Sequence, residues 1–217
     1  MAAPSGQLTA PSLQALLNDG SLAGEWVLDP GPSSIRLKTR NLLGLVPVRG
    51  VFREVSGNGS VSQDGEVSGT VTVAAASIDT KNARRDTHLR SPDFFDSGHE
   101  PDITFTADGI RPSGQGVALT GALTVRGRAR PLSFDAMVSV RDDGGIWLEA
   151  EVQVNRADFG LTWNLLGLVS MNNILIIHAV FTRRWNTGSG DVSSTGTMVP
   201  VRGDRVERVL DIAGQGV

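Results

Sequence analysis

The sequence of 217 residues contains no cysteine, and this absence excludes several classes of protein at once. Disulfide scaffolds, thiol catalysis and zinc sites built from thiolates all require cysteine. The chain also lacks a strong excess of either charge, because 20 basic and 23 acidic side chains leave a formal net charge of −3. Proteins whose main partner is nucleic acid rely on a surplus of basic groups. We therefore expect no nucleic-acid partner.

A basic start and a long apolar run are missing as well. The first basic residue is Arg36, and Pro4 and Pro11 interrupt the stretch before it. A secretory signal begins with a basic region that is followed by an unbroken apolar segment. No apolar run approaches the roughly 18 residues of a helix that spans a bilayer. The sequence therefore predicts a cytoplasmic protein that does not span the membrane.

The chain is rich in glycine and in alternating patterns. Glycine accounts for 26 of the 217 residues, about 12% against a usual ~7%, which indicates many turns. Apolar residues occupy every second position over 67–73, 117–125, 132–140 and 146–154. This period is typical of strands with one buried and one wet face. Short turns such as Asp64-Gly65 separate the strands. We predict an all-β fold, an eight-stranded antiparallel barrel, because closure removes exposed sheet edges.

Two segments before residue 100 depart from this alternation. After a disordered start over residues 1–10, residues 11–20 predict a short helix, with Pro11 in its first turn and a glycine past its end. Residues 77–98 predict a long crossover inside the barrel, with a helix that begins at Ser91-Pro92. The predicted divisions are a tail with a short helix (1–23), the barrel domain (24–185), and a flexible linker with a C-terminal tail (186–217).

Several short motifs inside the barrel region stand in a recognisable order. They are Trp26-Val27-Leu28-Asp29-Pro30, Ser77-Ile78-Asp79-Thr80, Asp93-Phe94-Phe95-Asp96, Pro101-Asp102-Ile103-Thr104-Phe105, and the segments 121–127 and 155–160. In these motifs the chain resembles the YceI-like family of lipid-binding proteins with an extended lipocalin fold. The resemblance implies a bacterial, lipocalin-like barrel whose apolar bore binds a polyisoprenoid or another long-chain amphiphile. The family often has histidines where Ser33 and Asn41 stand here, so contacts of those imidazoles are not expected.

The apolar rows of the strands supply the predicted ligand-binding residues. They are Ile35, Leu37, Phe52, Val71, Phe105, Leu123, Phe134 and Leu148. Small residues at the inward positions Gly69, Gly121, Ala136 and Ala150 leave room between them. The same pattern also fits a filled core, in which case the barrel is an interaction scaffold. With the resemblance, we favour a cavity for non-enzymatic binding, transport or storage of a lipid.

A basic cluster in the crossover is the polar candidate site. An anionic head group binds arginine at the mouth of an apolar pocket, and the predicted head-group contacts are Arg84, Arg85, His88 and Arg90. An alternative is that Arg85 and Asp86 form ion pairs that hold the crossover on the barrel. In a rival enzyme, His88 with Asp86 or Asp93 would be the acid–base pair. No HExxH, GxSxG or phosphate-loop motif is present, so we expect no enzyme, no metal and no cofactor.

One hexapeptide, Asn-Leu-Leu-Gly-Leu-Val, occurs at 41–46 and again at 164–169. Both copies interrupt the strand pattern, and glycine permits backbone angles that other residues avoid. The functional hypothesis is a pair of lids at one mouth of the barrel, formed by Leu43, Leu45, Leu166 and Leu168. The alternative is chance recurrence in a chain rich in leucine, glycine and valine. A homodimer is left open.

Overall fold

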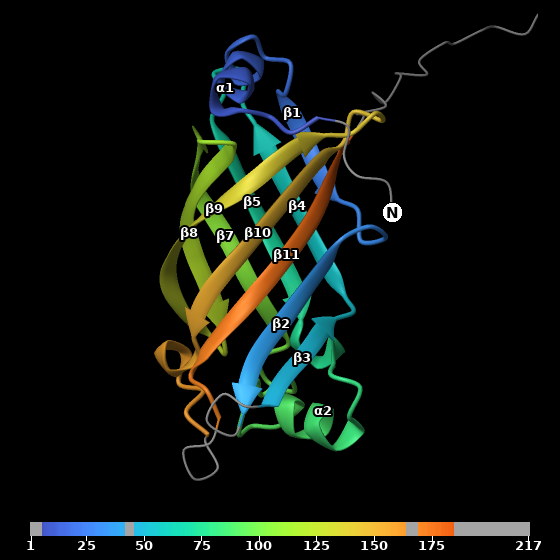
Figure 1. The fold of residues 1–217 in the computed structure, drawn as a ribbon, viewed down its shortest axis with the longest axis vertical. Helices are drawn as coiled ribbons and strands as arrows, with labels where there is room; N and C mark the ends of the chain where they lie inside the picture. The colour runs from blue at the N-terminus through green and yellow to red at the C-terminus, as the bar shows by residue number, and fades with distance from the viewer. Residues whose placement is uncertain (1–5, 42–45, 164–168, 185–217) are drawn as a thin grey trace, which may run out of the picture. The chain divides into compact units, whose positions relative to one another are not determined.

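In a computed structural model, residues 6–41, 46–163 and 169–184 are described, and they form a tall antiparallel barrel (Figure 1). The strands are β1 Gly24–Leu28, β2 Ser34–Asn41, β3 Val46–Phe52, β4 Val55–Val61, β5 Val67–Ala74, β6 Ile78–Asp79, β7 Asp102–Ser113, β8 Gly116–Val125, β9 Arg128–Val140, β10 Ile146–Asn155 and β11 Asn172–Arg183. The helices are α1 Ala10–Asn18 and α2 Ala83–Arg90, and single 3-10 turns lie at η1 Ala75–Ser77 and η2 Arg156–Phe159.

The sheet closes on itself through eight strands. The order β1-β4-β5-β7-β8-β9-β10-β11 returns to β1, and every pairing is antiparallel. The prediction of an eight-stranded antiparallel barrel is confirmed. Strand β11 pairs with β1 near its end and with β2 over Ile174–His178. Strands β2, β3 and β6 therefore extend the wall toward the end of the barrel at which α2 lies (Figure 1).

Because the sequence alternates, one of every two successive side chains along a strand points into the barrel. On β2, Ile35 and Leu37 face the interior, whereas Arg36 lies on the outer face and is exposed. Tight turns join the long strands, and Gly65 and Gly144 adopt φ of 79° in two of them. Only glycine adopts this left-handed backbone without strain, so the predicted turns fold where the sequence placed them.

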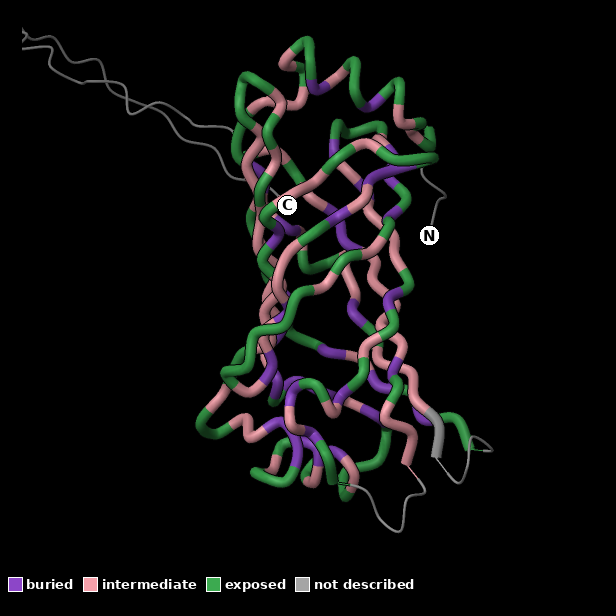
Figure 2. The backbone as a smooth tube through the Cα atoms, turned by 90° about the vertical axis from the view of Figure 1, so that its left-hand side faces the viewer, coloured by how far each residue is buried: buried purple, intermediate pink, exposed green. Residues whose placement is uncertain are grey.

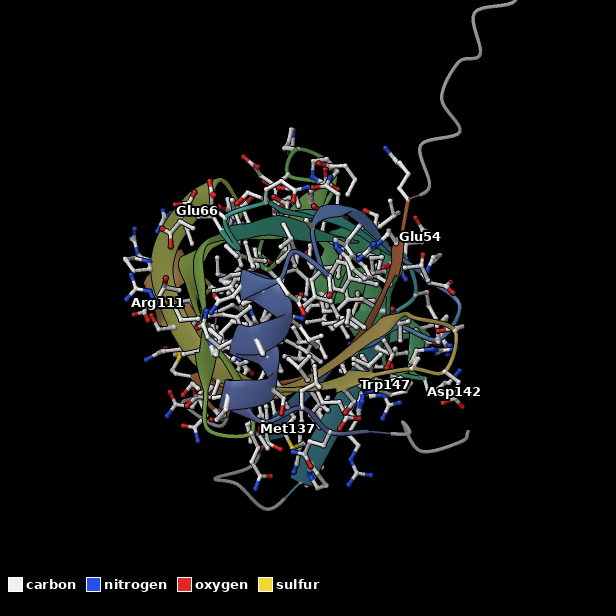
Figure 3. All side chains as sticks on the ribbon, turned by 90° about the horizontal axis from the view of Figure 1, so that it is seen from above. Glu54, Glu66, Arg111, Met137, Asp142 and Trp147 are labelled. Carbon is white, nitrogen blue, oxygen red and sulfur yellow. The ribbon has the colours of Figure 1, made fainter. Side chains whose placement is uncertain are left out.

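The predicted N-terminal helix is present and lies across one end of the barrel (Figures 1 and 3). The Thr9 side chain accepts a hydrogen bond from the Ser12 backbone N–H and caps the helix, with Pro11 in its first turn. Leu13 and Leu17, one turn apart, are buried beneath it. The helix thus closes this end of the barrel with apolar side chains.

Order also extends before this helix, where the sequence predicted none. Gln7 forms a bridge with Ser139 of β9, and the Leu8 N–H donates to the Val138 carbonyl. The predicted disorder over 1–10 is therefore wrong for residues 6–10. The edge of β9 supplies backbone partners for these residues, and their own sequence gives no sign of that pairing.

The helix in the crossover begins earlier than predicted. Helix α2 is capped by Asn82, whose side chain accepts from the Arg85 N–H, and it ends at Ser91. The prediction of a helix that starts at Ser91 is wrong. Pro92 drives the residue before it toward extended backbone, and Ser91 has ψ of 166°. The Ser-Pro pair ends a helix here.

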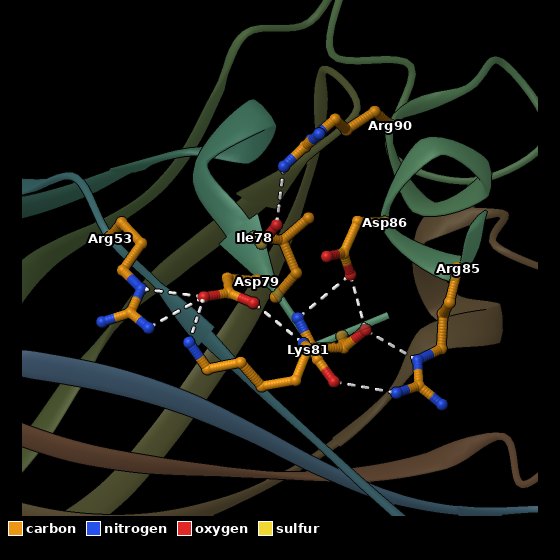
Figure 4. Close-up of polar contacts among 8 residues, drawn as sticks. Arg53, Ile78, Asp79, Lys81, Arg85, Asp86 and Arg90 are labelled. Carbon is orange, nitrogen blue, oxygen red and sulfur yellow. Dashed lines mark hydrogen bonds and ion pairs between the residues drawn. The ribbon is translucent and has the colours of Figure 1, made fainter. Parts of the chain in front are cut away.

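Hydrogen bonds tie α2 to the barrel through Thr80 (Figure 4). Buried Asp86 accepts from the Thr80 N–H at 3.0 Å and from its hydroxyl, while Arg85 donates to the Thr80 hydroxyl and carbonyl at 2.7 and 2.9 Å. The expected structural role of Arg85 and Asp86 is therefore present, but it runs through Thr80 rather than through an Arg85–Asp86 ion pair. Asp79 beside them binds Arg53 and Lys81, and these hydrogen bonds lower the pKa of its carboxyl.

The packed core is divided between the two ends of the barrel. One cluster beside α2 contains Phe52, Ile78, Leu89 and Phe95 among others. A second cluster beneath α1 contains Leu13, Leu17, Val117, Leu119, Ala136 and Val138. Figure 2 shows buried segments grouped toward the α2 end, with many intermediate segments along the wall. The middle of the bore is therefore less tightly packed than its ends.

Candidate functional site

A cavity of about 900 Å³ runs through the inside of the barrel. Its lining reaches from Leu13 and Leu17 of α1 to Arg84 and His88 of α2, so it extends along the full height of the barrel. Most of its lining side chains are aliphatic or aromatic. An apolar space of this size lies in the range of pockets that hold a small ligand.

All eight residues predicted to bind a ligand line this cavity. They are Ile35, Leu37, Phe52, Val71, Phe105, Leu123, Phe134 and Leu148. Five of them are only half-buried although they point inward: Leu37, Val71, Phe105, Phe134 and Leu148. Side chains of a filled core would be buried, so the bore holds open space.

The small inward residues contribute less evenly than predicted. Gly69 lies opposite Gly59 across β4 and β5, and both line the cavity. A Cβ on Gly69 would stand 2.9 Å from the Asn58 carbonyl oxygen, so the glycine permits close approach of the two strands. Gly121 does not line it, because the Phe105 ring lies over that position, 3.0 Å from where a Cβ would stand. Ala136 and Ala150 belong to the packed cluster beneath α1. The space attributed to these three residues is therefore filled.

The ionisable side chains that line the cavity are all basic residue types. They are Arg84, Arg85, His88 and Arg156, and no aspartate or glutamate is among the described lining residues. All four come from α2 and η2, at the same end of the barrel. The cavity is therefore an apolar tube with positive charge at one end, an arrangement that suits an amphiphile with an acidic head group.

The predicted head-group residues differ in how many contacts already hold their side chains. Arg84 is exposed and makes no ion pair or side-chain hydrogen bond among the described residues, whereas Arg85 is held by Thr80. The His88 ring packs edge-on against Trp163, with ring centres 4.3 Å apart. Arg90 lies elsewhere, since it donates to the carbonyls of Ala76 and Ile78 and is absent from the lining.

Arg156 is a lining residue that the sequence reasoning missed. It is buried, and its guanidinium donates to the carbonyls of Leu161, Trp163 and Ser170. It also lies over the Phe94 ring, 5.6 Å from the ring centre, and burial lowers its pKa. Arg156 lies in the segment 155–160 that carries part of the resemblance, but nothing in the sequence shows that three backbone carbonyls, 5, 7 and 14 residues further along the chain, surround its guanidinium.

The residues that a catalytic or metal site would need are not brought together. Asp86 is occupied by Thr80, and the contacts of the His88 ring are with aromatic rings. His178 bonds Glu149 at 2.8 Å on the outer face of β10 and β11, away from the cavity. Within 6–41, 46–163 and 169–184, no three histidine, aspartate or glutamate side chains gather as a metal site would require.

Two further predictions concern access and membrane insertion. The four predicted lid residues, Leu43, Leu45, Leu166 and Leu168, lie outside the described residues. In the part of the chain that the structure describes, no helix has the length and apolar character needed to cross a bilayer.

Comparisons with known proteins agree with this architecture. A family model for the YceI-like domain matches residues 26–181. Protein YceI of Escherichia coli O17:K52:H18 is 32% identical over 142 residues, which cover 62% of this chain and 74% of that protein.

Two solved structures share the fold at lower identity. Burkholderia cenocepacia BcnA matches with a TM-score of 0.65 and 21% identity, covering 70% of this chain and 98% of BcnA. A polyisoprenoid-binding domain from Saccharophagus degradans matches with a TM-score of 0.59 and 16% identity, covering 73% of this chain and 98% of that domain. At these identities the structures support the fold alone. The match over residues 26–181 and the Escherichia coli relative show more: the chain belongs to the YceI-like family.

Proposed function

We propose that this protein binds a long-chain isoprenoid or similar amphiphilic lipid in its barrel and transports or stores it without chemical change. The observation that carries the proposal is the apolar cavity of about 900 Å³ that runs along the inside of the barrel. Burial of each methylene group contributes about 0.8 kcal/mol, so such a chain binds tightly without a catalytic group. The Saccharophagus degradans domain, named for polyisoprenoid binding, supports the same class of ligand.

The size of the cavity suggests a length for the lipid tail. At roughly 30 Å³ for each non-hydrogen atom, as in a liquid, about 900 Å³ holds about 30 atoms. This corresponds to about six isoprene units of five carbons each. A shorter chain leaves part of the bore empty, and a longer chain protrudes from one end.

The charge distribution suggests an orientation for the lipid. Arg84, Arg85 and His88 line the α2 end, and we assign the head group to them. Arg90 is left out because its guanidinium is bonded to backbone carbonyls. The tail then extends toward Leu13 and Leu17 beneath α1. An acidic head group such as a phosphate fits this arrangement best, because the described lining has no carboxylate to repel it.

The two rival functions fit the structure less well. An interaction scaffold requires a filled bore, but Val71, Phe105 and Leu148 face open space. An enzyme that uses His88 requires a carboxylate beside the imidazole. Asp86 is instead bonded to Thr80, and exposed Asp93 forms no hydrogen bond or ion pair with His88. Neither rival accounts for a continuous apolar tube.

Native mass spectrometry of gently purified protein tests the proposal. We expect the protein to carry extra mass that organic solvent removes and that returns after incubation with a prenyl phosphate. Val71→Trp, which narrows the bore, should reduce the uptake. Thr106→Trp changes an exposed residue on the outer face and serves as the matched control. Protein that carries no lipid and takes up none would refute the function. Conversion of the lipid during incubation would favour the enzyme.

A further inference from the structure

Two of the three exposed large hydrophobic side chains of the described residues lie at the α2 end of the barrel, whereas the third, Met137, lies on β9 beside the α1 end. Among the described residues, three large hydrophobic side chains are exposed: Val46 at 43%, Met137 at 49% and Trp163 at 38%. Val46 begins β3 at the end beside α2, and Trp163 packs on His88 of α2. Trp163 also lines the cavity, so the tube reaches the surface beside an exposed indole.

Basic side chains stand next to this apolar rim without partners. Lys38 and Arg49 lie directly opposite each other on β2 and β3, and neither forms an ion pair among the described residues. Neither lines the cavity, and their neighbours Leu37 and Val48 do, so both lie on the outer face. Like charges directly opposite each other destabilise a sheet. Exposed Arg84 of α2 adds a third unpaired charge.

Carboxylates do not neutralise this side of the barrel. Asp79 is shared between Arg53 and Lys81, and Asp86 is buried against Thr80. The other carboxylates of this end lie outside β2 and β3: Asp93, Asp96 and Glu100 are in the connection between α2 and β7, Asp102 begins β7, and Asp158 is in η2. Asp96 is paired with His99.

The opposite end carries charge of the other sign. Acidic residues in and beside the connections around α1 include Asp19, Asp64, Glu66, Asp142 and Asp143. Figure 3 labels Glu66 and Asp142 among them, together with basic Arg111. Arg141 at this end is paired with Asp143. The protein is therefore polarised along its length, and its positive end is the one with exposed Trp163 and Val46.

We propose that the α2 end docks on an anionic membrane surface, with Lys38, Arg49 and Arg84 on the lipid head groups and Trp163 and Val46 among them. The inference rests on the proposed function, since docking would let a lipid pass between bilayer and bore without crossing water. A bilayer fits better than an acidic protein. Indole and aliphatic side chains beside basic ones are the combination that binds the membrane interface.

The expected strength follows from the charges. Each basic side chain near an anionic membrane contributes about 1 kcal/mol, which corresponds to a factor of about five in binding. Reversal of one charge removes this attraction and adds a repulsion of equal size, so it weakens binding by five times five, or about 25-fold. At about 1 M salt the Debye length falls to roughly 3 Å from roughly 10 Å at 0.1 M, so most of the attraction is screened.

Sedimentation with vesicles tests the proposal on the full chain. We expect binding to vesicles of equal parts phosphatidylglycerol and phosphatidylcholine at about 0.1 M salt, and little binding to phosphatidylcholine alone. Lys38→Glu should weaken binding about 25-fold. The same change should leave the melting temperature unchanged or higher, because it places opposite charges across from each other at Arg49. Arg111→Glu at the α1 end is the matched control and should bind like the parent protein.

Two outcomes would overturn the docking surface: no binding to the anionic vesicles, or equal weakening by Lys38→Glu and Arg111→Glu. Native mass spectrometry of the same samples separates this result from the proposed function. Lipid in the bore without vesicle binding refutes the docking alone. Vesicle binding by protein that never contains lipid refutes the function and leaves the docking standing.

Discussion

The cavity volume predicts how affinity depends on the length of a prenyl chain. Ligands of this size gain about 0.3 kcal/mol for each non-hydrogen atom, so an isoprene unit adds about 1.5 kcal/mol, or roughly tenfold in affinity. The bore of about 900 Å³ holds about six such units. Affinity should therefore rise about tenfold with each added unit and level off near six. Displacement of a fluorescent fatty acid by prenyl alcohols of three to nine units measures this dependence.

Substitution inside the bore should move this limit. Val71 is half-buried and lines the cavity, so Val71→Phe adds about four non-hydrogen atoms and removes roughly 120 Å³ of space. The plateau should then come about one isoprene unit earlier. Thr106→Phe on the outer face should leave the plateau in place. An affinity that does not depend on chain length, or that still rises at nine units, would show that the tail does not lie in this cavity.

Three further predictions concern stability and charge. Arg156→Met leaves three carbonyls without their donor, so we expect a loss of about 3 kcal/mol or more in thermal or urea unfolding; an unchanged midpoint would contradict this. Ile78→Ala removes a fully buried side chain from the packed core and should lower the free energy of unfolding by about 4–5 kcal/mol. Leu148→Ala removes a side chain that faces the cavity and should lower it by about 2–3 kcal/mol in the same assay. Equal losses would indicate a filled bore. A hydrogen bond to Asp96 raises the pKa of His99. The stabilisation by this pair is therefore complete below the ordinary pKa of about 6.5 and is lost as pH rises through the raised value. An NMR titration should show a midpoint for His99 that falls in Asp96→Asn; a midpoint that does not move would remove Asp96 as the cause.

The barrel could be predicted because its strands and turns are marked by short, local sequence patterns. Alternation over 146–154 requires one face inside, and the turn glycines mark where each strand ends. The lining follows from the same period, so the sequence alone assigns residues such as Val71 and Leu148 to the interior without any strand pairing. Successive residues of a strand point to opposite faces of the sheet, so the odd or even position of a residue decides which face it occupies. This alternation can be read directly from the sequence.

The alternation does not decide whether the space beside an inward-facing residue is open or is filled by a neighbouring side chain. Gly69 lines the cavity, whereas Gly121 is covered by the Phe105 ring from the neighbouring strand and does not line it. The difference depends on register between strands that are separate in the sequence. Arg156 was missed for a related reason, since its partners are backbone carbonyls, which every residue has and no sequence pattern marks.

Helix α1 contributes to the end of the cavity although it belongs to no strand of the barrel. Leu13 and Leu17, on a helix of nine residues before the first strand, line the cavity together with strand residues such as Val117 and Leu119. Neither leucine takes part in a strand pairing, so their size can set the depth of the bore separately from the sheet. The length of tail that this protein accepts is therefore open to change through two positions of one short helix.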